Sequence, residues 1–169
     1  MHDGKLNLTQ LDALVFDFDG VLTDNRVHLD ESGKEWVSCN RADGLAFDVL
    51  RKLNFPAYIL STELNPVVSA RARKIKIPIL QGLTDKSQAL LTLVENNGYC
   101  MDRVLYIGND LNDYDVMMRC GVSVCPADSH PIIKEMANFV LETRGGDGVA
   151  RELLENLLNV DFLKILCGK

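Results

Sequence analysis

Two aspartates flank Phe18 in the pattern Asp17-Phe18-Asp19-Gly20, directly after the apolar run from Ala13 to Phe16. Side chains two positions apart on an extended strand point the same way, so both carboxylates face one spot while Phe18 turns back into the core. Gly20 allows the chain to bend sharply after the pair. The pattern predicts a carboxylate site at the end of a buried strand.

A second acidic group follows the apolar run from Val104 to Ile107 and comprises Asp110, Asp113 and Asp115. In open α/β sheets, ligands bind outside the carboxyl ends of the strands, so Asp110 meets the first pair if the two strands are neighbours. Two unit charges ~4 Å apart repel by about 4 kcal/mol at an effective dielectric constant of about 20. Such a cluster needs protons or a cation, and oxygen ligands without His or Cys favour Mg²⁺.

Two further polar residues stand at comparable places. Ser61 follows the apolar run from Tyr58 to Leu60, and Lys86 comes at the start of the next helical pattern. A hydroxyl, an ammonium group and a metal around a nucleophilic carboxylate form a phosphoryl-transfer site. Alone, Ser61 fits a strand-end cap and Lys86 fits a helix-surface lysine. All four features in this order, each at a strand exit or helix start, predict phosphoryl transfer.

The elements that must position these side chains are short apolar runs that alternate with helical patterns. This order predicts an α/β fold, a Rossmann-like doubly wound parallel sheet, as one domain over residues 1–169. We expect helix boundaries at Asp43 (N-cap), Asn65-Pro66 (N-cap and first residue), Gly98 and Gly121 (stops). The expected strands are 13–16, 57–60, 104–107, 122–125 and 139–141.

Residues 26–38 interrupt this alternation. Val27 and Leu29 alternate with polar residues, a Glu-Ser-Gly-Lys turn follows, and Trp36-Val37 resumes the apolar pattern. The segment predicts a β-hairpin that projects from the sheet. Two interpretations remain open: a plain surface hairpin, or an edge that pairs with another subunit through Trp36.

Composition limits the class of protein. The chain has 169 residues, and 18 Lys and Arg against 24 Asp and Glu give a net charge of −6. This balance argues against nucleic-acid binding. No apolar run approaches the ~18 residues of a membrane span, and the first ten residues lack the apolar stretch of a signal peptide, so we expect a cytoplasmic protein. The five cysteines include no CxxC pair, which indicates reduced, mostly buried thiols.

The motifs together resemble those of the haloacid dehalogenase (HAD) superfamily of phosphatases. Its four motifs are similar to residues 17–24, Ser61, Lys86 and residues 108–113. The likeness is closer to the capless 3-deoxy-D-manno-octulosonate 8-phosphate phosphatase group, which includes the phosphatase-like domain of acylneuraminate cytidylyltransferases. Features similar to that group are the hairpin and residues 43–44, 81–82, 127–131 and 145–152.

The resemblance implies a covalent mechanism. Asp17 would attack phosphorus and form an aspartyl phosphate, and Asp19 would protonate the leaving alcohol and then activate water. Ser61 and Lys86 would hold the phosphoryl oxygens. Mg²⁺ would be bound by Asp17, the Asp19 main-chain carbonyl and Asp110.

The acidic motif departs from the family pattern. Relatives often have Gly-Asp-Asp where this chain has Gly108-Asn109-Asp110. Asn109 or Asp113 could therefore replace Asp110 as the distal metal ligand. We expect Asp113 instead to orient either Lys86 or a metal-bound water.

Spacing leaves no room for a cap domain. The hairpin and one helix occupy the chain between Asp19 and Ser61, and one helix and one strand occupy that between Lys86 and Asp110. An open site needs closure from elsewhere. The resemblance implies a homotetramer assembled through the hairpins, with residues 144–151 of a neighbour near the site and Arg151 binding substrate; a plain turn before a helix over 149–158 is the alternative.

The substrate expectation depends on one position. Octulosonate phosphatases usually have Thr-Gly-Arg in the second motif, whereas this chain has Ser61-Thr62-Glu63. An arginine there could pair with a sugar carboxylate, and Glu63 cannot. With Thr62 and Glu63 as substrate-binding residues, this change favours a nine-carbon keto-sugar acid 9-phosphate, of the sialic or deaminated sialic type, or the cytidylyltransferase-associated domain. The octulosonate 8-phosphate stays open as the other substrate.

Three functions are compatible with a cluster of acidic residues and a lysine in an α/β domain. The favoured one is a Mg²⁺-dependent phosphatase of a phosphorylated 2-keto-3-deoxy sugar acid. The second is a weakly active tetramerisation domain associated with acylneuraminate cytidylyltransferase, against which the intact catalytic positions argue. The third is a phosphoacceptor receiver, which needs an aspartate at the end of a middle strand where this chain has Ser61.

Overall fold

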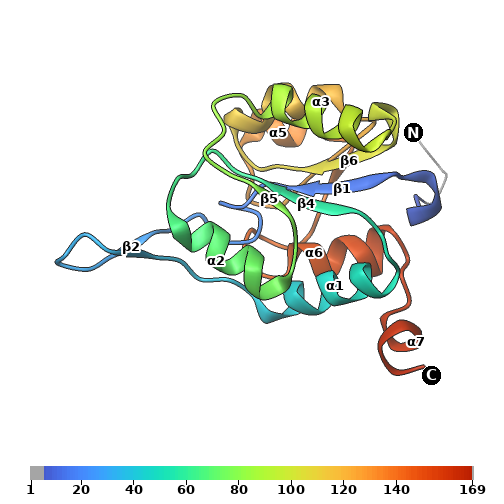
Figure 1. Ribbon diagram of the computed structural model, residues 1–169, viewed down its shortest axis with the longest axis horizontal. Coiled ribbons are helices and arrows are strands. Elements are labelled where there is room, and N and C mark those ends of the chain that lie inside the picture. Colours follow the sequence, from blue (N-terminus) through green and yellow to red (C-terminus); the bar gives the residue numbers. More distant parts are fainter. Residues whose placement is uncertain (1–5, 169) are drawn as a thin grey trace.

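A computed structural model describes residues 6–168. Its core is a sheet of six strands in the order β5-β4-β1-β6-β7-β8, and every pair is parallel (Figure 1). The sheet confirms the predicted doubly wound α/β fold. The strands are β1 (Ala13–Phe16), β4 (Ala57–Leu60), β5 (Ile79–Leu80), β6 (Val104–Ile107), β7 (Val122–Cys125) and β8 (Phe139–Val140).

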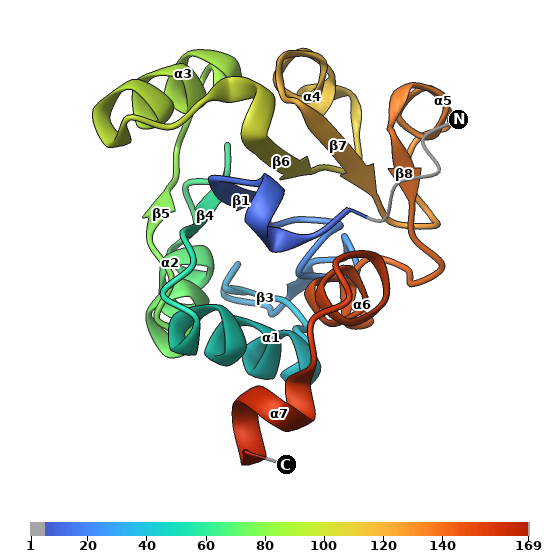
Figure 2. The ribbon, with the colours of Figure 1, turned by 90° about the vertical axis from the view of Figure 1, so that its right-hand side faces the viewer.

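Helices cover both faces of this sheet, as Figure 2 shows. One layer contains α3 (Lys86–Asn97), α4 (Tyr114–Arg119) and α5 (Pro131–Met136). The other contains α1 (Arg41–Lys52), α2 (Pro66–Ile75), α6 (Val149–Glu152), the π-helical turn Leu153–Leu157 that continues α6, and the terminal α7 (Phe162–Cys167). Three 3-10 turns complete the list: Leu8–Gln10, Met101–Arg103 and Leu111–Asp113. No helix in the described part of the chain is long and apolar enough to span a bilayer.

The central strand β1 is apolar and buried at all four positions, as expected for a strand covered on both faces. Phe16 packs edge-to-face on Phe47 of α1, with ring centroids 5.1 Å apart. Within the sheet, β1 pairs with β6 in a register that sets Phe16 opposite Ile107. This register brings the residues after both strands to one edge of the sheet.

The predicted hairpin is present and projects from the body of the molecule (Figure 1). Strands β2 (His28–Leu29) and β3 (Glu35–Trp36) are antiparallel. The rings of His28 and Trp36 stack with centroids 3.9 Å apart. The Asp30 carboxylate closes the turn by accepting hydrogen bonds from the Lys34 and Ser32 backbone N–H groups, at 2.9 Å each.

Two helix boundaries were predicted correctly and two were wrong. Asn65 caps α2 and Gly98 ends α3 in a left-handed conformation. Helix α1, however, is capped by Asn40, because the Asp43 side chain points inward instead. Helix α4 ends at Arg119 with Cys120 extended, and Gly121 is required by its close approach to the Asp102 backbone.

The cysteine prediction was also partly wrong. All five are free, but only Cys125 is buried. Cys100 and Cys167 are exposed because they lie at the ends of helical segments rather than inside the core.

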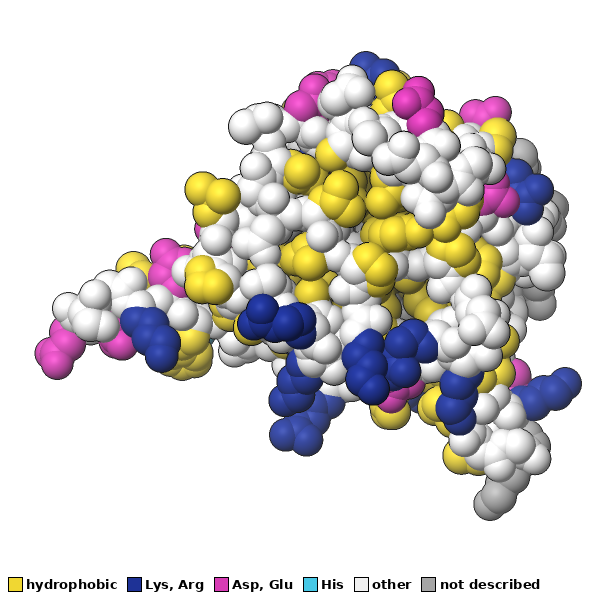
Figure 3. All heavy atoms as spheres, in the orientation of Figure 1, with side chains coloured by type: hydrophobic (Ala, Val, Ile, Leu, Met, Phe, Trp, Pro, Cys, Tyr) yellow, Lys and Arg dark blue, Asp and Glu magenta, His cyan; other side chains and the backbone are white. Residues whose placement is uncertain are grey.

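Figure 3 shows apolar side chains on the face that carries edge strand β5, with lysines and arginines gathered below them. On α2, Arg73 and Lys74 are exposed. Arg71 donates to the Asn40 carbonyl oxygen over 2.7 Å. This arrangement fits the mostly solvated helix face that a basic run usually forms.

Asp43 joins α1 to the start of α6. Its side chain is 1% exposed, and its Oδ1 accepts a hydrogen bond from the Ala150 N–H over 2.9 Å. Oδ2 is buried and has no hydrogen-bond partner in the described structure. Burial raises the pKa of Asp43 to about 6 from 3.8, although the N–H groups of Ala150 and Arg151 oppose the shift. The folded protein therefore holds this proton more tightly than the unfolded chain.

We expect Asp43→Asn to remove this pH dependence. Because the folded pKa is the higher one, the Asp43 contribution to stability falls as pH rises from 3.8 to about 6, by about 3 kcal/mol in total. Urea unfolding at pH 4 and pH 7 measures the free energy of unfolding of both proteins. Relative to the native protein, the variant should be more stable at pH 7 than at pH 4, by up to that amount. A difference that is the same at both pH values would contradict the assignment.

Candidate active site

Six of the predicted site residues line one pocket at the carboxyl edge of the sheet, and Lys86 contacts Asp17 without lining that pocket. The pocket has a volume of about 310 Å³. Its lining combines carboxylates, amides and hydroxyls: Asp17, Asp19, Asn25, Ser61, Thr62, Asn109, Asp110 and Asn112. The Asp17 N–H extends the β1–β6 ladder by donating to the Ile107 carbonyl over 2.8 Å. Strand pairing therefore determines where the first carboxylate lies.

The chain turns immediately after Asp19. The N–H groups of Leu22 and Thr23 donate to the Phe18 carbonyl over 2.9 and 3.2 Å, and Gly20 has a φ of +79°. A side chain at Gly20 would collide with the Asn109 amide. The glycine is needed both for the turn and for the close approach of the second acidic loop.

Lys86 is the buried centre of the site. Its Nζ lies 2.7 Å from Asp17 Oδ1 and 2.7 Å from Asp113 Oδ1. The Tyr106 hydroxyl donates to the same Asp113 oxygen over 2.9 Å, and the Asn109 N–H donates to Asp113 Oδ2 over 2.9 Å. Both oxygens of Asp113 are thus engaged, and this residue positions Lys86 instead of facing the pocket.

Burial controls the protonation of this group. It raises the pKa of Asp17 to about 8; Asp113 adds to the shift and Lys86 opposes it. Burial disfavours the charge on Lys86, but Asp17 and Asp113 outweigh it and raise the Lys86 pKa. Further positive charge beside Asp17 would lower its pKa and favour the ionised carboxylate.

Asp19 differs from Asp17 because it is only partly buried. Burial raises its pKa, with Glu63 and Glu35 adding to the shift and a hydrogen bond from the Thr23 hydroxyl opposing it. The Thr23 Oγ1 lies 3.5 Å from Asp19 Oδ1. A carboxyl group that retains its proton at higher pH is suited to act as a general acid.

Residues after β4 supply the opposite wall. The Ser61 hydroxyl oxygen accepts the Glu63 N–H over 3.1 Å, and Thr62 is exposed beside it. The Glu63 carboxylate bends toward α2, where Oε1 accepts the N–H groups of Leu64 and Asn65 over 2.7 and 2.8 Å. Glu63 lies outside this pocket but lines an adjoining one.

The structure does not bring Arg151 to the pocket of its own chain. Its Nε pairs with Glu155 Oε2 at 2.6 Å, and its guanidinium lies 4.5 Å from the Phe162 ring centroid. The glycine-rich segment before it packs behind the Asp19 turn, where the Gly146 N–H donates to the Val21 carbonyl over 3.0 Å. The predicted contact with a neighbouring subunit stays a prediction.

Sequence reasoning missed Asn25 and Asn112, which also line the pocket. Asn25 has a φ of +61°, a left-handed conformation that asparagine tolerates better than most residues. Its place directly after the first motif was the only available signal. Tyr106 was missed because it was read as a strand residue without a chemical role.

The pocket residues fit a divalent cation. Among residues 6–168 there is no cluster of three or more His, Cys, Asp or Glu side chains arranged as metal ligands. Mg²⁺, however, usually takes one or two carboxylates and keeps several waters. Asp17 and Asp110 offer such a pair beside the Asn109 amide. Since the Asp17 and Asp113 carboxyl groups share one ammonium group, that of Lys86, a cation would add positive charge where two carboxyl groups are buried.

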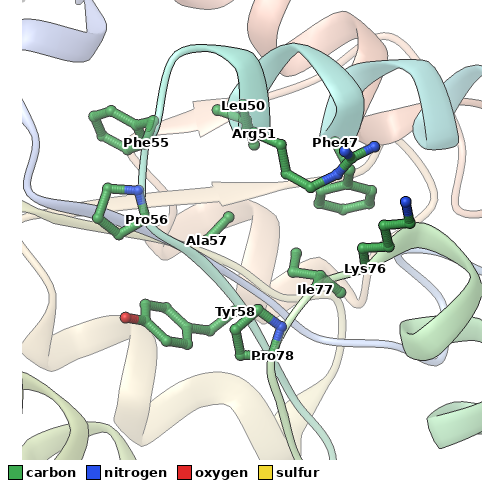
Figure 4. Close-up of a pocket in the computed structure, with 10 residues that line it drawn as sticks. All are labelled: Phe47, Leu50, Arg51, Phe55, Pro56, Ala57, Tyr58, Lys76, Ile77 and Pro78. Carbon is green, nitrogen blue, oxygen red and sulfur yellow. The ribbon is translucent and has the colours of Figure 1, made fainter.

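A second hollow, shown in Figure 4, lies at the opposite, amino end of β4 and β5. It is lined mainly by aromatic and aliphatic side chains, including Phe47, Phe55 and Tyr58. None of the ten described residues around it carries a carboxylate. This hollow therefore lacks the carboxylates that line the pocket at the carboxyl edge.

Comparison with known proteins gives a consistent result. The family model described as haloacid dehalogenase-like hydrolase matches residues 54–153. The 3-deoxy-D-manno-octulosonate 8-phosphate phosphatase KdsC of Salmonella typhi is 33% identical over 146 residues, covering 86% of this chain and 78% of that protein.

Two solved structures agree with it. A protein from Streptomyces avermitilis described as a HAD family hydrolase superposes with a TM-score of 0.90 at 43% identity, covering 94% of this chain and 91% of its own. The Moraxella catarrhalis octulosonate 8-phosphate phosphatase, solved with a magnesium ion, a phosphate ion and KDO, gives 0.85 at 25% identity, with coverages of 90% and 88%.

We expect Asp113→Asn to destabilise the fold. The new amide would place a donor against the Asn109 N–H, leaving a buried group unpaired at a cost of about 1–3 kcal/mol. Asp115→Asn, an exposed neighbour, is the matched control and should change stability by less than about 0.5 kcal/mol. Equal urea-unfolding midpoints for the two variants would contradict the positioning role of Asp113.

Proposed function

This chain belongs to the haloacid dehalogenase-like hydrolases, within the capless octulosonate-phosphate phosphatase group, and is a phosphoric monoester hydrolase; from this premise we propose that it dephosphorylates a 2-keto-3-deoxy sugar acid phosphate through Asp17. One observation carries the proposal. The Asp17 carboxylate is held 2.7 Å from the Lys86 ammonium at a pocket that also contains Ser61 and Asp110. A nucleophile and a hydroxyl thus line one space, and the ammonium group of Lys86 contacts the nucleophile from the protein interior.

The proposed reaction has two steps. Asp17 attacks phosphorus, a P–O bond to its carboxylate forms, and the bond to the sugar oxygen breaks while Asp19 gives that oxygen its proton. Asp19, now a carboxylate, takes a proton from water, which attacks the aspartyl phosphate and releases inorganic phosphate and Asp17. Lys86 and the Ser61 hydroxyl hold the phosphoryl oxygens during both steps.

The proposed cofactor is Mg²⁺, held by Asp17, the Asp19 main-chain carbonyl and Asp110. When bound, it supplies positive charge that favours ionised Asp17 and offsets the charge of the phosphoryl group. The raised pKa of Asp17 supports this role, because the nucleophile needs more positive charge than Lys86 provides. The magnesium in the Moraxella relative is consistent with it.

Two sugar acids are candidates for the substrate. The relatives named as octulosonate 8-phosphate phosphatases support the eight-carbon acid. Glu63, where an arginine is usual in that group, favours a nine-carbon acid of the sialic type. We prefer the nine-carbon 9-phosphate on this ground.

The assembly and location are part of the same proposal. The projecting hairpin, with Val27, Leu29 and Trp36 exposed, supports a homotetramer. Five free cysteines suit the reducing cytoplasm. The competing function, a weakly active tetramerisation domain associated with a cytidylyltransferase, is disfavoured because Asp17, Asp19 and Lys86 are all chemically competent.

We expect Asp17→Asn to abolish phosphate release, by a factor of at least about 10³, because it removes the nucleophile without changing shape. The assay is phosphate release from both sugar acid phosphates, with Mg²⁺ and with a chelator in its place. Asp115→Asn, which changes the same charge outside the pocket, should retain native activity. Unchanged turnover in Asp17→Asn would end the covalent mechanism.

The substrate preference has its own test. The native protein should turn over the nine-carbon 9-phosphate with a higher kcat/KM than the octulosonate 8-phosphate, and Glu63→Arg should shift this ratio toward the octulosonate. Glu63→Gln controls for the hydrogen bonds that Glu63 makes to the start of α2. A clear native preference for the octulosonate would refute the nine-carbon assignment while leaving the phosphatase intact.

A further inference from the structure

A further cavity, distinct from the catalytic pocket and from the apolar hollow of Figure 4, opens on the hairpin side of Asp19. Its volume is about 240 Å³, and it shares two wall residues, Asp19 and Asn25, with the catalytic pocket. The two spaces therefore adjoin at the residue proposed to protonate the leaving oxygen. A substrate whose phosphorus lies near Asp17 would place its leaving group in this cavity.

The cavity contains a cation suited to a carboxylate. Arg26 lines it, directly after the left-handed Asn25. This short loop is tied down at two points: the Arg26 N–H donates to Asp24 Oδ1 over 3.2 Å, and the Asn25 N–H donates to the Thr23 hydroxyl oxygen over 3.3 Å. An arginine guanidinium can bind a carboxylate through two parallel hydrogen bonds.

Besides Asp19, the cavity lining includes two carboxylates that are held in place, from Glu35 of the hairpin and from Glu63. Asn65 holds both: its Nδ2 donates to Glu35 Oε2 over 2.8 Å, and its backbone N–H donates to Glu63 Oε1 over 2.8 Å. Each carboxylate keeps one oxygen outside these bonds. Such oxygens accept hydrogen bonds from sugar hydroxyls.

Apolar side chains complete the wall at Val27, Val37 and Val67. The methyl groups of these valines can pack against the C–H groups of a sugar chain. One cation, two acceptors and an apolar strip together match a polyhydroxylated carboxylic acid better than a simple alcohol.

Resting on the proposed function, we propose that this cavity binds the leaving sugar acid, with Arg26 pairing with its carboxylate and Glu35 accepting hydrogen bonds from its hydroxyls. Neither residue belongs to the four motifs that carry the reaction. The hairpin thereby determines substrate choice from within its own subunit.

The test compares Arg26→Gln with Lys34→Gln, which removes the same charge from the hairpin turn. The kcat/KM for the preferred sugar acid phosphate, divided by that for p-nitrophenyl phosphate, should fall by about 10- to 100-fold in Arg26→Gln, mainly through KM. The ratio should not change in Lys34→Gln. On the substrate's carboxylate methyl ester, the loss caused by Arg26→Gln should largely disappear.

Glu35→Gln provides the second arm, with Glu31→Gln on the hairpin turn as its control. It should raise KM for the sugar acid phosphate several-fold more than KM for p-nitrophenyl phosphate. If native protein hydrolyses sugar acid phosphates and both cavity variants match their controls, the cavity assignment is overturned and the phosphatase stands. If native protein hydrolyses p-nitrophenyl phosphate but no sugar acid phosphate, the proposed substrate class fails, and the cavity assignment fails with it.

Discussion

The whole site depends on a buried ionic group in which one ammonium, Lys86, serves two carboxylates, Asp17 and Asp113. Removing such charges from water costs several kcal/mol per ion, so the group is stable only when its remaining hydrogen-bonding positions are filled. The Tyr106 hydroxyl and the Asn109 N–H meet that need at Asp113. The remaining position, on the pocket side of Asp17, is the one left for chemistry.

This group explains why the fold is arranged as it is. Its three charges come from the end of β1, the start of α3 and the loop after β6. Those elements meet only because β1 and β6 are adjacent parallel strands in a register that aligns Phe16 with Ile107. Gly20 then allows the Asn109 loop to close over the turn. Packing of the sheet and placement of the nucleophile are thus a single requirement.

Electrostatics connects this arrangement to a cation. Lys86 only partly offsets the effects of burial and of Asp113, which together raise the pKa of Asp17 to about 8. A divalent ion beside Asp17 and Asp110 would restore the charge that attack on phosphorus requires. The acidic excess of the chain is therefore compatible with an anionic substrate at this edge of the sheet.

Much of this could be predicted from the sequence, since strands buried on both faces are continuous apolar runs and their carboxyl ends carry the polar residues. The two-residue strand β5 was missed because Ile79 and Leu80 are too few for a pattern. The prediction that Asp43 caps a helix was wrong because the group that it binds, the Ala150 N–H, is distant in sequence. Asn25 and Arg26 gave no motif signal; only the folded hairpin brings them beside Asp19.

The most direct test of the central claim uses a sugar acid phosphate whose phosphoryl group is isotopically labelled. The reaction is quenched rapidly, and the protein is then analysed by peptide mass spectrometry. The account predicts a transient, hydroxylamine-sensitive phosphoryl group on Asp17; phosphate release with no labelled peptide, or with label on another residue, would contradict it.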